Sequence, residues 1–301
     1  QRTTFGIEGV EEHALGLRLV DDAVRIAKRL DKLAKRKRRA SIVIVGGGVS
    51  GVEALGEILR RRGQGDEFNI HIVELESRLL EQQPRGLADD AIQRLEPYPV
   101  SVHTNASVAQ VNARSVVLTS GEKLTADLCI WSAGMALPDF LRDSKLNAAD
   151  DDWLPVDDTL QSLYADNIFV AGDCASLPLP IRKQAYYAMD MGEVAGDNIK
   201  RLLGDRRLRR FRATPMPMLV SFGDITTWLV AGESVVASPL LAAAKEGVYQ
   251  ATMARLESPS EPLRYSADVV GRAVMATRRL LLPQLTPSKI FEGLVGSRLI
   301  P

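Results

Sequence analysis

The stretch Ser41-Ile42-Val43-Ile44-Val45-Gly46-Gly47-Gly48-Val49-Ser50-Gly51 decides the fold of this 301-residue chain. Its first five residues form an almost continuous β-branched run, which is typical of a parallel strand buried on both faces. The glycines end that strand, and the residues from Val52 to Arg61 have the pattern of a helix. A second strand is predicted at residues 69–74, so the segment reads as a βαβ unit.

The glycines of this stretch point to a dinucleotide. Gly46, Gly48 and Gly51 fit G-x-G-x-x-G, in which they allow a tight turn, close approach of a pyrophosphate and close helix packing. Glu74 ends the next strand, and its distance along the chain from Gly51 is close to the expected spacing of about 20 residues. A carboxylate at this position binds ribose hydroxyls. The pattern predicts NADH rather than NADPH, although Arg78 weakens that preference. The alternative is a glycine turn that merely connects strand to helix.

Further elements extend this unit on both sides. The apolar spacing predicts a helix from Leu17 to Leu33. The basic run of residues 35–39 reads as a solvated linker rather than a nucleic-acid patch. We expect residues 84–99 to be irregular. The remaining predictions in this half are a small antiparallel meander from residues 100–103, 108–111 and 116–118, and a buried strand at residues 126–131 that stops at Ala133-Gly134.

The second half of the chain contains one more motif at a strand end. Residues 168–171 read as a buried parallel strand ending at Gly172-Asp173, and a helix is predicted from about 184 to 203. Asp173 is placed where α/β sheets bind ligands, or it is a helix N-cap. Cys174 reads as a small buried residue. The later predictions are strands at residues 218–221 and 226–230, and helices at residues 240–256 and 266–282.

The composition sets limits on function. Lys plus Arg and Asp plus Glu both number 38, which argues against a protein that binds nucleic acid by bulk charge. Two cysteines, Cys129 and Cys174, cannot form a disulfide framework, and no Cys/His cluster predicts a zinc site or another metal site. No stretch reaches the roughly 18 to 20 apolar residues of a membrane span, and no signal peptide opens the chain. A reducing, cytoplasmic location is expected.

Five segments in a fixed order resemble one family. They are residues 9–14 (GVEEHA), 45–53 (VGGGVSGVE), 131–134 (WSAG), 168–175 (IFVAGDCA) and 192–199 (GEVAGDNI). Together they resemble the flavoprotein pyridine nucleotide-disulphide oxidoreductases, and most of all the type II NADH dehydrogenase branch. The ordered set is more specific than any one of its motifs.

The resemblance implies an α/β architecture in which a Rossmann-type NAD-binding domain is inserted into a split FAD-binding domain, followed by a C-terminal α+β region. Mapped onto this chain, residues 1–38 are a remnant of the FAD-binding domain and 39–134 the NAD(H)-binding domain. Residues 135–212 are the second part of the FAD-binding domain, and 213–301 form the interface or membrane-association region. The implied cofactors are FAD and NADH.

The same resemblance assigns roles to single residues. Gly46 to Gly51, including Gly47, contact the NADH pyrophosphate, and Glu53 lies near the nicotinamide. From its position in the first helical turn alone, Glu53 could equally be a carboxylate stabilised by the helix dipole. Gly134, Gly172 and Asp173 are assigned to the cofactors, with Asp173 on the FAD ribityl chain. The family's first strand and its FAD diphosphate loop are expected before Gln1, so the chain reads as a fragment.

One departure from the family concerns the electron acceptor. Type II dehydrogenases carry an Ala-Gln pair and a further Gln four residues on, beside the flavin and the quinone. Aligned on Gly192, this chain has Ala185-Tyr186 and then Asp190. Tyr186 is therefore the candidate catalytic residue on the acceptor side, and the acceptor is predicted as a quinone or another molecule.

The leading hypothesis is an FAD-dependent NADH dehydrogenase-like oxidoreductase. A disulfide reductase of the same superfamily and a non-catalytic NAD(H)-binding regulatory protein are the alternatives. The tail, residues 266–301, predicts an amphipathic helix for peripheral contact with the inner face of the cell membrane, or for packing on the protein's own core or in a homodimer.

Overall fold

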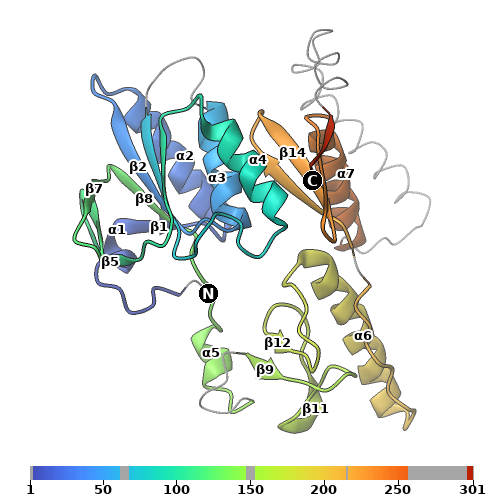
Figure 1. Cartoon of the computed structure of the whole chain (residues 1–301). Coiled ribbons are helices and arrows are strands. Elements are labelled where there is room, and N and C mark those ends of the chain that lie inside the picture. The colour runs from blue at the N-terminus through green and yellow to red at the C-terminus, as the bar shows by residue number, and fades with distance from the viewer. Residues whose placement is uncertain (1–2, 62–67, 147–152, 215, 257–296, 301) are drawn as a thin grey trace. The chain divides into compact units, whose positions relative to one another are not determined.

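The computed structural model describes residues 3–61, 68–146, 153–214, 216–256 and 297–300. It divides into two compact units, which are described here one at a time (Figure 1). Of the described residues, those within 3–134 and 217–300 form the larger unit, and those within 135–216 form the smaller one. Residues 3–38 pack within the larger unit, together with the glycine-rich stretch. The four-domain assignment made from the sequence stays a prediction.

A parallel five-stranded sheet is the frame of the larger unit. Its strand order is β1-β8-β2-β3-β4, and every neighbouring pair is parallel. The strands are β1 (Ala14–Gly16), β2 (Ala40–Val45), β3 (Phe68–Val73), β4 (Val100–His103) and β8 (Leu128–Trp131). All six residues of β2 are buried, because β2 lies between two strands and is covered on both faces. This confirms a parallel Rossmann-like α/β fold.

Helices cover one face of this sheet. They are α2 (Val20–Ala34), α3 (Val49–Arg61) and α4 (Arg85–Leu95). Their apolar residues join Ile42, Ile44, Ile70 and Ile72 of the sheet in one hydrophobic core. The connections β2-α3-β3-α4-β4 repeat the βαβ unit, so the carboxyl ends of all the parallel strands meet at one edge.

A small antiparallel sheet covers the other face. Its strands are β5 (Val108–Asn112), β6 (Ser115–Leu118) and β7 (Lys123–Thr125), and the short helix α1 (Val10–His13) contacts β5. Val43, Val45 and Val73 of the parallel sheet pack against Val111 and Val116 of the meander. The alternation of side chains along a strand therefore splits the unit into two cores.

Two expectations about residues 84–103 are wrong. The stretch expected to be irregular contains α4, because Leu87, Ala88, Ala91 and Leu95 lie on one buried helical face. Pro84 is the residue preceding the first turn of α4, where a missing N–H costs nothing. Residues 100–103 were assigned to the meander, but β4 instead pairs in parallel with β3.

The last part of the larger unit is a second antiparallel sheet, built from β13 (Met218–Phe222), β14 (Thr226–Ala231), β15 (Ser234–Ala237) and β16 (Arg298–Ile300). Helix α7 (Leu241–Leu256) packs on β14 (Figure 1). The sheet meets α3 at a close backbone approach: a Cβ on Gly56 would lie 2.5 Å from the backbone of Gly223. Only glycine fits there.

The smaller unit is built around the long helix α6 (Ala185–Leu203) (Figure 1). It also contains the short helix α5 (Asp139–Arg142) and the strands β9 (Leu154–Pro155), β10 (Gln161–Ser162), β11 (Ala165–Phe169) and β12 (Ala175–Ser176). The buried parallel strand expected at residues 168–171 is a correction. The strand found there, β11, is antiparallel to β10 and only partly buried, because β10 is its one partner strand in the described part of the chain.

Among the helices in the described ranges, none has the length and apolar character needed to cross a membrane. The helix predicted at residues 266–282, and most of the tail expected to contact a membrane or a second subunit, lie outside the described residues.

Candidate functional site

The glycine-rich loop joins the carboxyl end of β2 to the start of α3. Gly46 has a φ of 103°, a conformation that L side chains rarely adopt, and its N–H donates to the Val73 carbonyl at 2.8 Å. A Cβ on Gly51 would lie 1.8 Å from the carbonyl oxygen of Gly46. The first and third glycines therefore have the two backbone roles that the sequence predicts: a tight turn and close packing of the helix.

The middle glycines of the loop differ from each other. A Cβ on Gly48 would meet no atom within 4 Å, so the protein leaves open space beside this residue. A Cβ on Gly47 would meet Leu79 at 2.4 Å and Glu74 at 3.0 Å. The open space beside Gly48 lies next to the first turn of α3, where backbone N–H groups and the helix dipole favour an anion. This geometry fits a pyrophosphate.

Glu74 lies directly against the loop. Its Oε2 accepts a hydrogen bond from the Gly47 N–H at 2.5 Å, and its Oε1 accepts one from the Glu76 N–H at 2.9 Å. Glu74 is half-buried at the end of β3. The carboxylate that the sequence assigned to a ribose is thus held in place by backbone donors on two segments.

Arg78 does not extend toward this carboxylate. Its guanidinium donates to the carbonyl oxygens of Leu80 at 2.9 Å, Glu81 at 2.6 Å and Gln83 at 2.9 Å. The Glu81 carboxylate lies 3.3 Å from Arg78 Nε. These contacts occupy the guanidinium with the turn that follows β3.

Glu53, predicted near the nicotinamide, is bound by the C-terminal sheet and helix. Its Oε1 accepts a hydrogen bond from the Ser221 N–H at 2.9 Å and forms an ion pair with Lys245 of α7. Glu53 also lines a cavity of about 520 Å³ between α2 and α3, whose other lining residues include Ile26, Leu30 and Ile58. The Glu53 carboxylate therefore connects α3 to β13 and α7.

The segment Trp131 to Gly134 supports the glycine loop from the neighbouring strand. The Ser132 hydroxyl contacts the carbonyl oxygens of Val45 at 2.9 Å and Gly46 at 3.0 Å. Gly134 has a φ of 69°, and a Cβ there would lie 2.3 Å from the Thr3 side chain. Gly134, predicted as a cofactor contact, is thus packed against the N-terminal segment.

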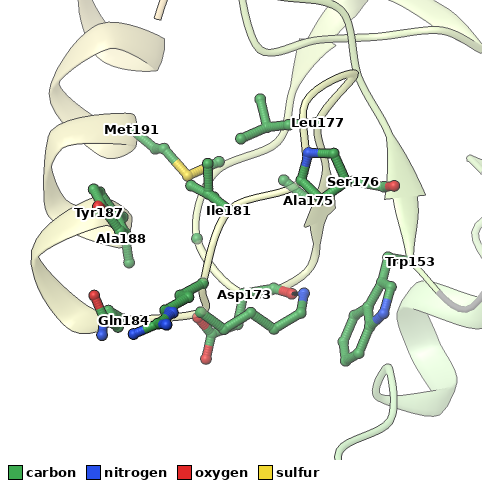
Figure 2. Close-up of a pocket in the computed structure, with 14 residues that line it drawn as sticks. Trp153, Asp173, Ala175, Ser176, Leu177, Ile181, Gln184, Tyr187, Ala188 and Met191 are labelled. Carbon is green, nitrogen blue, oxygen red and sulfur yellow. Dashed lines mark hydrogen bonds between the residues drawn. The ribbon is translucent and has the colours of Figure 1, made fainter. Parts of the chain in front are cut away.

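The smaller unit has its own cavity, of about 280 Å³, beside the start of α6. Figure 2 shows Tyr187, Ala188 and Met191 of α6 on one side of it and Trp153 on the opposite side. Gly172, with a φ of 81°, and Asp173 both line it, and their assignment to the cofactor stays a prediction. Among the described residues that line this cavity, Asp173 is the one with an acidic side chain.

Lys183 faces the same cavity and was not predicted. Its ammonium lies 3.5 Å from the centre of the Trp153 ring and donates to the backbone carbonyl of Asp173. Burial lowers the pKa of Lys183, against the opposite influence of Asp173 and Cys174. Lys183 directly precedes Gln184, where a helix is predicted to start, so its position in the sequence could have indicated that it lies near Asp173. Nothing in the sequence around Trp153 indicates that it lines the cavity.

The two other candidates in this unit do not line the cavity. The Tyr186 hydroxyl contacts the Gln184 side chain and the Met216 carbonyl at 3.3 Å, while the neighbouring Tyr187 takes the place in the cavity wall. Burial raises the pKa of Tyr186. Burial also raises the pKa of the Cys174 thiol, which contacts the Ala171 carbonyl at 3.4 Å, an environment that disfavours a reactive thiolate.

In the part of the chain that the structure describes, no group of three or more His, Cys, Asp or Glu side chains is arranged to hold a metal ion. The structure thus presents two candidate sites for organic ligands. One is the glycine loop with Glu74 in the larger unit, and the other is the cavity with Asp173 in the smaller unit.

Comparisons with known proteins give matches to a family model, to curated relatives and to solved structures. The profile of the family described as "Pyridine nucleotide-disulphide oxidoreductase" matches residues 1–192. A type II NADH:quinone oxidoreductase of Haemophilus influenzae is 29% identical over 212 residues, covering 63% of this chain and 46% of the relative. One of the same description from Staphylococcus aureus is 29% identical over 247 residues, covering 73% of this chain and 61% of the relative. The chain thus spans about half the length of these relatives.

Solved structures show the same fold. NDH2 from Plasmodium falciparum in complex with NADH superposes with a TM-score of 0.72 at 16% identity, covering 92% of this chain and 76% of that one. An NAD-dependent persulfide reductase from A. fulgidus superposes with a TM-score of 0.61 at 18% identity, covering 79% and 42%. At these identities the likeness concerns the fold alone.

Proposed function

Because the chain belongs to the pyridine nucleotide-disulphide oxidoreductase family, we propose that it is an FAD-dependent NADH dehydrogenase-like oxidoreductase, or part of one. NADH gives a hydride to the flavin, and electrons then pass to a quinone or another acceptor. The observation that supports this most directly is the glycine loop of residues 46–51, which has open space at Gly48 and the carboxylate of Glu74 beside it.

The larger unit binds NADH in this proposal. Gly46 and Gly51 shape the loop, Gly48 leaves room for the pyrophosphate, and the N-terminus of α3 attracts its charge. Glu74 accepts hydrogen bonds from the adenosine ribose hydroxyls with the lone pairs that its two backbone donors leave available. The resemblance adds Glu53 beside the nicotinamide, where Lys245 and the Ser221 N–H fix the position of its carboxylate.

The preference for NADH over NADPH rests on two residues. The Glu74 carboxylate repels a 2′-phosphate at the position where it accepts a ribose hydroxyl. Arg78, the nearby cation that could bind such a phosphate, donates instead to three backbone carbonyls and pairs with Glu81. These contacts of Arg78 support the predicted preference for NADH.

The smaller unit contributes to the flavin site in this proposal. FAD, when bound, accepts the hydride and passes electrons on; the protein supplies binding, orientation and electrostatics. Gly172 and Asp173 line the cavity beside α6, and Asp173 accepts hydrogen bonds from ribityl hydroxyls. Lys183 and the N-terminus of α6 give the same cavity a positive side. The lining therefore suits a polyhydroxyl chain next to a ring that takes up negative charge when it is reduced.

The acceptor is the open part of the proposal. Two curated relatives are described as NADH:quinone oxidoreductases. This chain has Tyr186 and Asp190 where that branch has glutamines, and Tyr186 lies outside the cavity wall in the smaller unit. Quinone and another acceptor both fit the proposal, as does peripheral attachment to a membrane or a dimer through the C-terminal region.

Anaerobic titration of the purified protein, supplied with FAD, tests the proposal. We expect NADH to bleach the visible absorption of the flavin, and we expect isothermal titration calorimetry to show NADH binding to the protein. The Asp173→Ala variant should bind NADH as the wild type does but lose flavin. NADH binding without bleaching would contradict the oxidoreductase and favour a non-catalytic NAD(H)-binding protein.

A further inference from the structure

Two of the three histidines in the chain meet on neighbouring strands beside the glycine-loop site, where the Glu74 N–H donates to the His103 carbonyl at 2.8 Å. His71 lies in β3 and His103 in β4, and the register pairs His71 with Ser101 and Val73 with His103. Because side chains alternate along a strand, His71 and His103 project from the same face of the sheet. Val73 shares that face and packs in the core formed with the meander.

The ring nitrogens of the pair face each other. His71 Nδ1 lies 3.1 Å from His103 Nε2, and the ring centres are 5.3 Å apart. Two nitrogens bound to one tetrahedral zinc ion at about 2.0–2.1 Å are separated by about 3.3–3.4 Å, slightly more than the 3.1 Å of this pair. We propose that His71 and His103 form a binding site for a divalent transition-metal ion such as Zn²⁺, which takes the place of the proton that they share. A small rotation of the rings and bound water complete the coordination.

The carboxylate of Glu122 supports this site from the turn between β6 and β7. It lies 4.0 Å from His103 Nδ1, the ring nitrogen on the side away from His71. A carboxylate at the far nitrogen of a metal-bound histidine fixes the tautomer and raises the basicity of the ligand. Glu122 is thus an orienting group and not a third ligand, which leaves the protein with two ligands at this site.

The chemistry of the two rings sets the class of metal ion. Their imidazole nitrogens suit Zn²⁺, Ni²⁺ or Cu²⁺ and not Mg²⁺ or Ca²⁺. His103 has 18% of its side chain exposed, which gives an ion a way in.

A bound ion would link β3 to β4 and so stabilise the larger unit. Ligands that bind only the folded protein raise its unfolding temperature, and the rise grows with the logarithm of the ligand concentration above the Kd. This role does not depend on NADH or flavin binding, and it can be measured whether or not the proposed function holds.

The chain has only three histidines, so their ring signals can be followed one by one by NMR in the wild-type protein. Metal-free protein is titrated with Zn²⁺ alone, and with Mg²⁺ as the negative control. We expect Zn²⁺ to shift the ring signals of His71 and His103 and to leave those of His13 unchanged. Calorimetry should show one Zn²⁺ per chain.

Variants complete the test. His71→Asn and His103→Asn should each weaken Zn²⁺ binding at least 100-fold, and Glu122→Gln should weaken it about tenfold. His13→Asn is the matched control, since His13 lies 3.8 Å from Glu12 and far along the chain from the pair, and it should bind as the wild type does. The proposal is overturned if Zn²⁺ moves no ring signal of the pair, or if His13→Asn alone removes binding.

Discussion

The carboxylate of Glu74 accepts a hydrogen bond from the backbone N–H of Gly47 at 2.5 Å. Two residues that are 27 positions apart are thereby joined at the carboxyl edge of the parallel sheet, one from the end of β3 and one from the loop after β2. The bond fixes the middle of the glycine loop and directs the second carboxylate oxygen toward the turn at Glu76. Glu74 therefore holds the glycine loop in place, in addition to its proposed contact with the ribose.

Replacing Glu74 with Ala should reduce NADH affinity by roughly tenfold, or about 1.4 kcal/mol, because hydrogen bonds to the ribose are lost. NADPH affinity should fall less or rise, because the repulsion of the 2′-phosphate disappears. Calorimetric titration with both nucleotides measures the ratio. Glu76→Ala, an exposed acid two residues away, is the control. An unchanged ratio in Glu74→Ala would remove this residue from the site.

Replacing Gly48 and replacing Gly51 with a residue that has a side chain should affect the protein differently. Gly48→Val is expected to fold with an unfolding temperature close to the wild type, since its Cβ meets nothing, but to lose at least 100-fold in NADH affinity. Gly51→Ala should instead unfold at a lower temperature, because its Cβ would lie 1.8 Å from the Gly46 carbonyl oxygen. Thermal unfolding and NADH titration on both variants check this. Wild-type NADH binding by a folded Gly48→Val protein would show that the loop is only a turn.

Glu53→Gln should slow NADH-dependent flavin reduction in the flavin-loaded protein by about tenfold, if its carboxylate lies beside the nicotinamide. Stopped-flow absorbance measures the rate. Lys245→Met is the matched control, because it removes the same ion pair and leaves the carboxylate in place. If the two variants lower stability equally and leave the rate unchanged, Glu53 serves only to fasten α7 and β13 to α3.

Trp228→Phe should destabilise the larger unit by about 2–3 kcal/mol. The Trp228 indole is fully buried and donates to Asp90 at 2.7 Å, and Asp90 is itself 4% exposed and binds Arg94 at 2.6 Å. The variant leaves a small cavity and takes a hydrogen bond from a buried carboxylate. Urea unfolding followed by circular dichroism gives the difference, and a change below about 0.5 kcal/mol would count against this contact.

Asp127 should make the larger unit sensitive to acid. Burial favours the neutral carboxyl, but hydrogen bonds from Arg38 and the Ser41 N–H, with the charges of Arg38 and Arg36, outweigh it and lower the pKa below its usual 3.8. A lowered pKa in the folded state means that the contribution to stability is present above pH 3.8 and is lost as the pH falls through the lower folded value.

The Asp127→Asn variant isolates this contribution. It should be less stable than the wild type by about 1–2 kcal/mol at pH 7, and the difference should vanish as the pH falls through the lowered pKa of Asp127 in the folded protein. Thermal unfolding of both proteins across this range measures it, with Asp89→Asn, an exposed acid, as the control. A difference that stays constant with pH would show that the effect is not ionic.

Local patterns explain the parts that the sequence predicted correctly. The β-branched run of β2 and the glycines behind it need only their neighbours to be recognised, since strand propensity and positive φ are properties of single residues. The region around Pro84 was misread because prolines at both ends suggested a loop, whereas Pro84 precedes the first turn of α4. Residues 100–103 were misplaced because a short strand carries no sign of its partner.

The sequence by itself determined the βαβ unit, the glycine-rich loop, the acid at the end of β3 and the membership of a family, because each depends on residue types at short, fixed spacing. The tertiary structure decided which distant residues meet: Lys245 with Glu53, Trp153 with Lys183, and His71 with His103. Strand order and register set those encounters. Strand order and register depend on the burial of whole faces and on the pairing of whole strands. No local stretch of the sequence therefore predicts which distant residues meet.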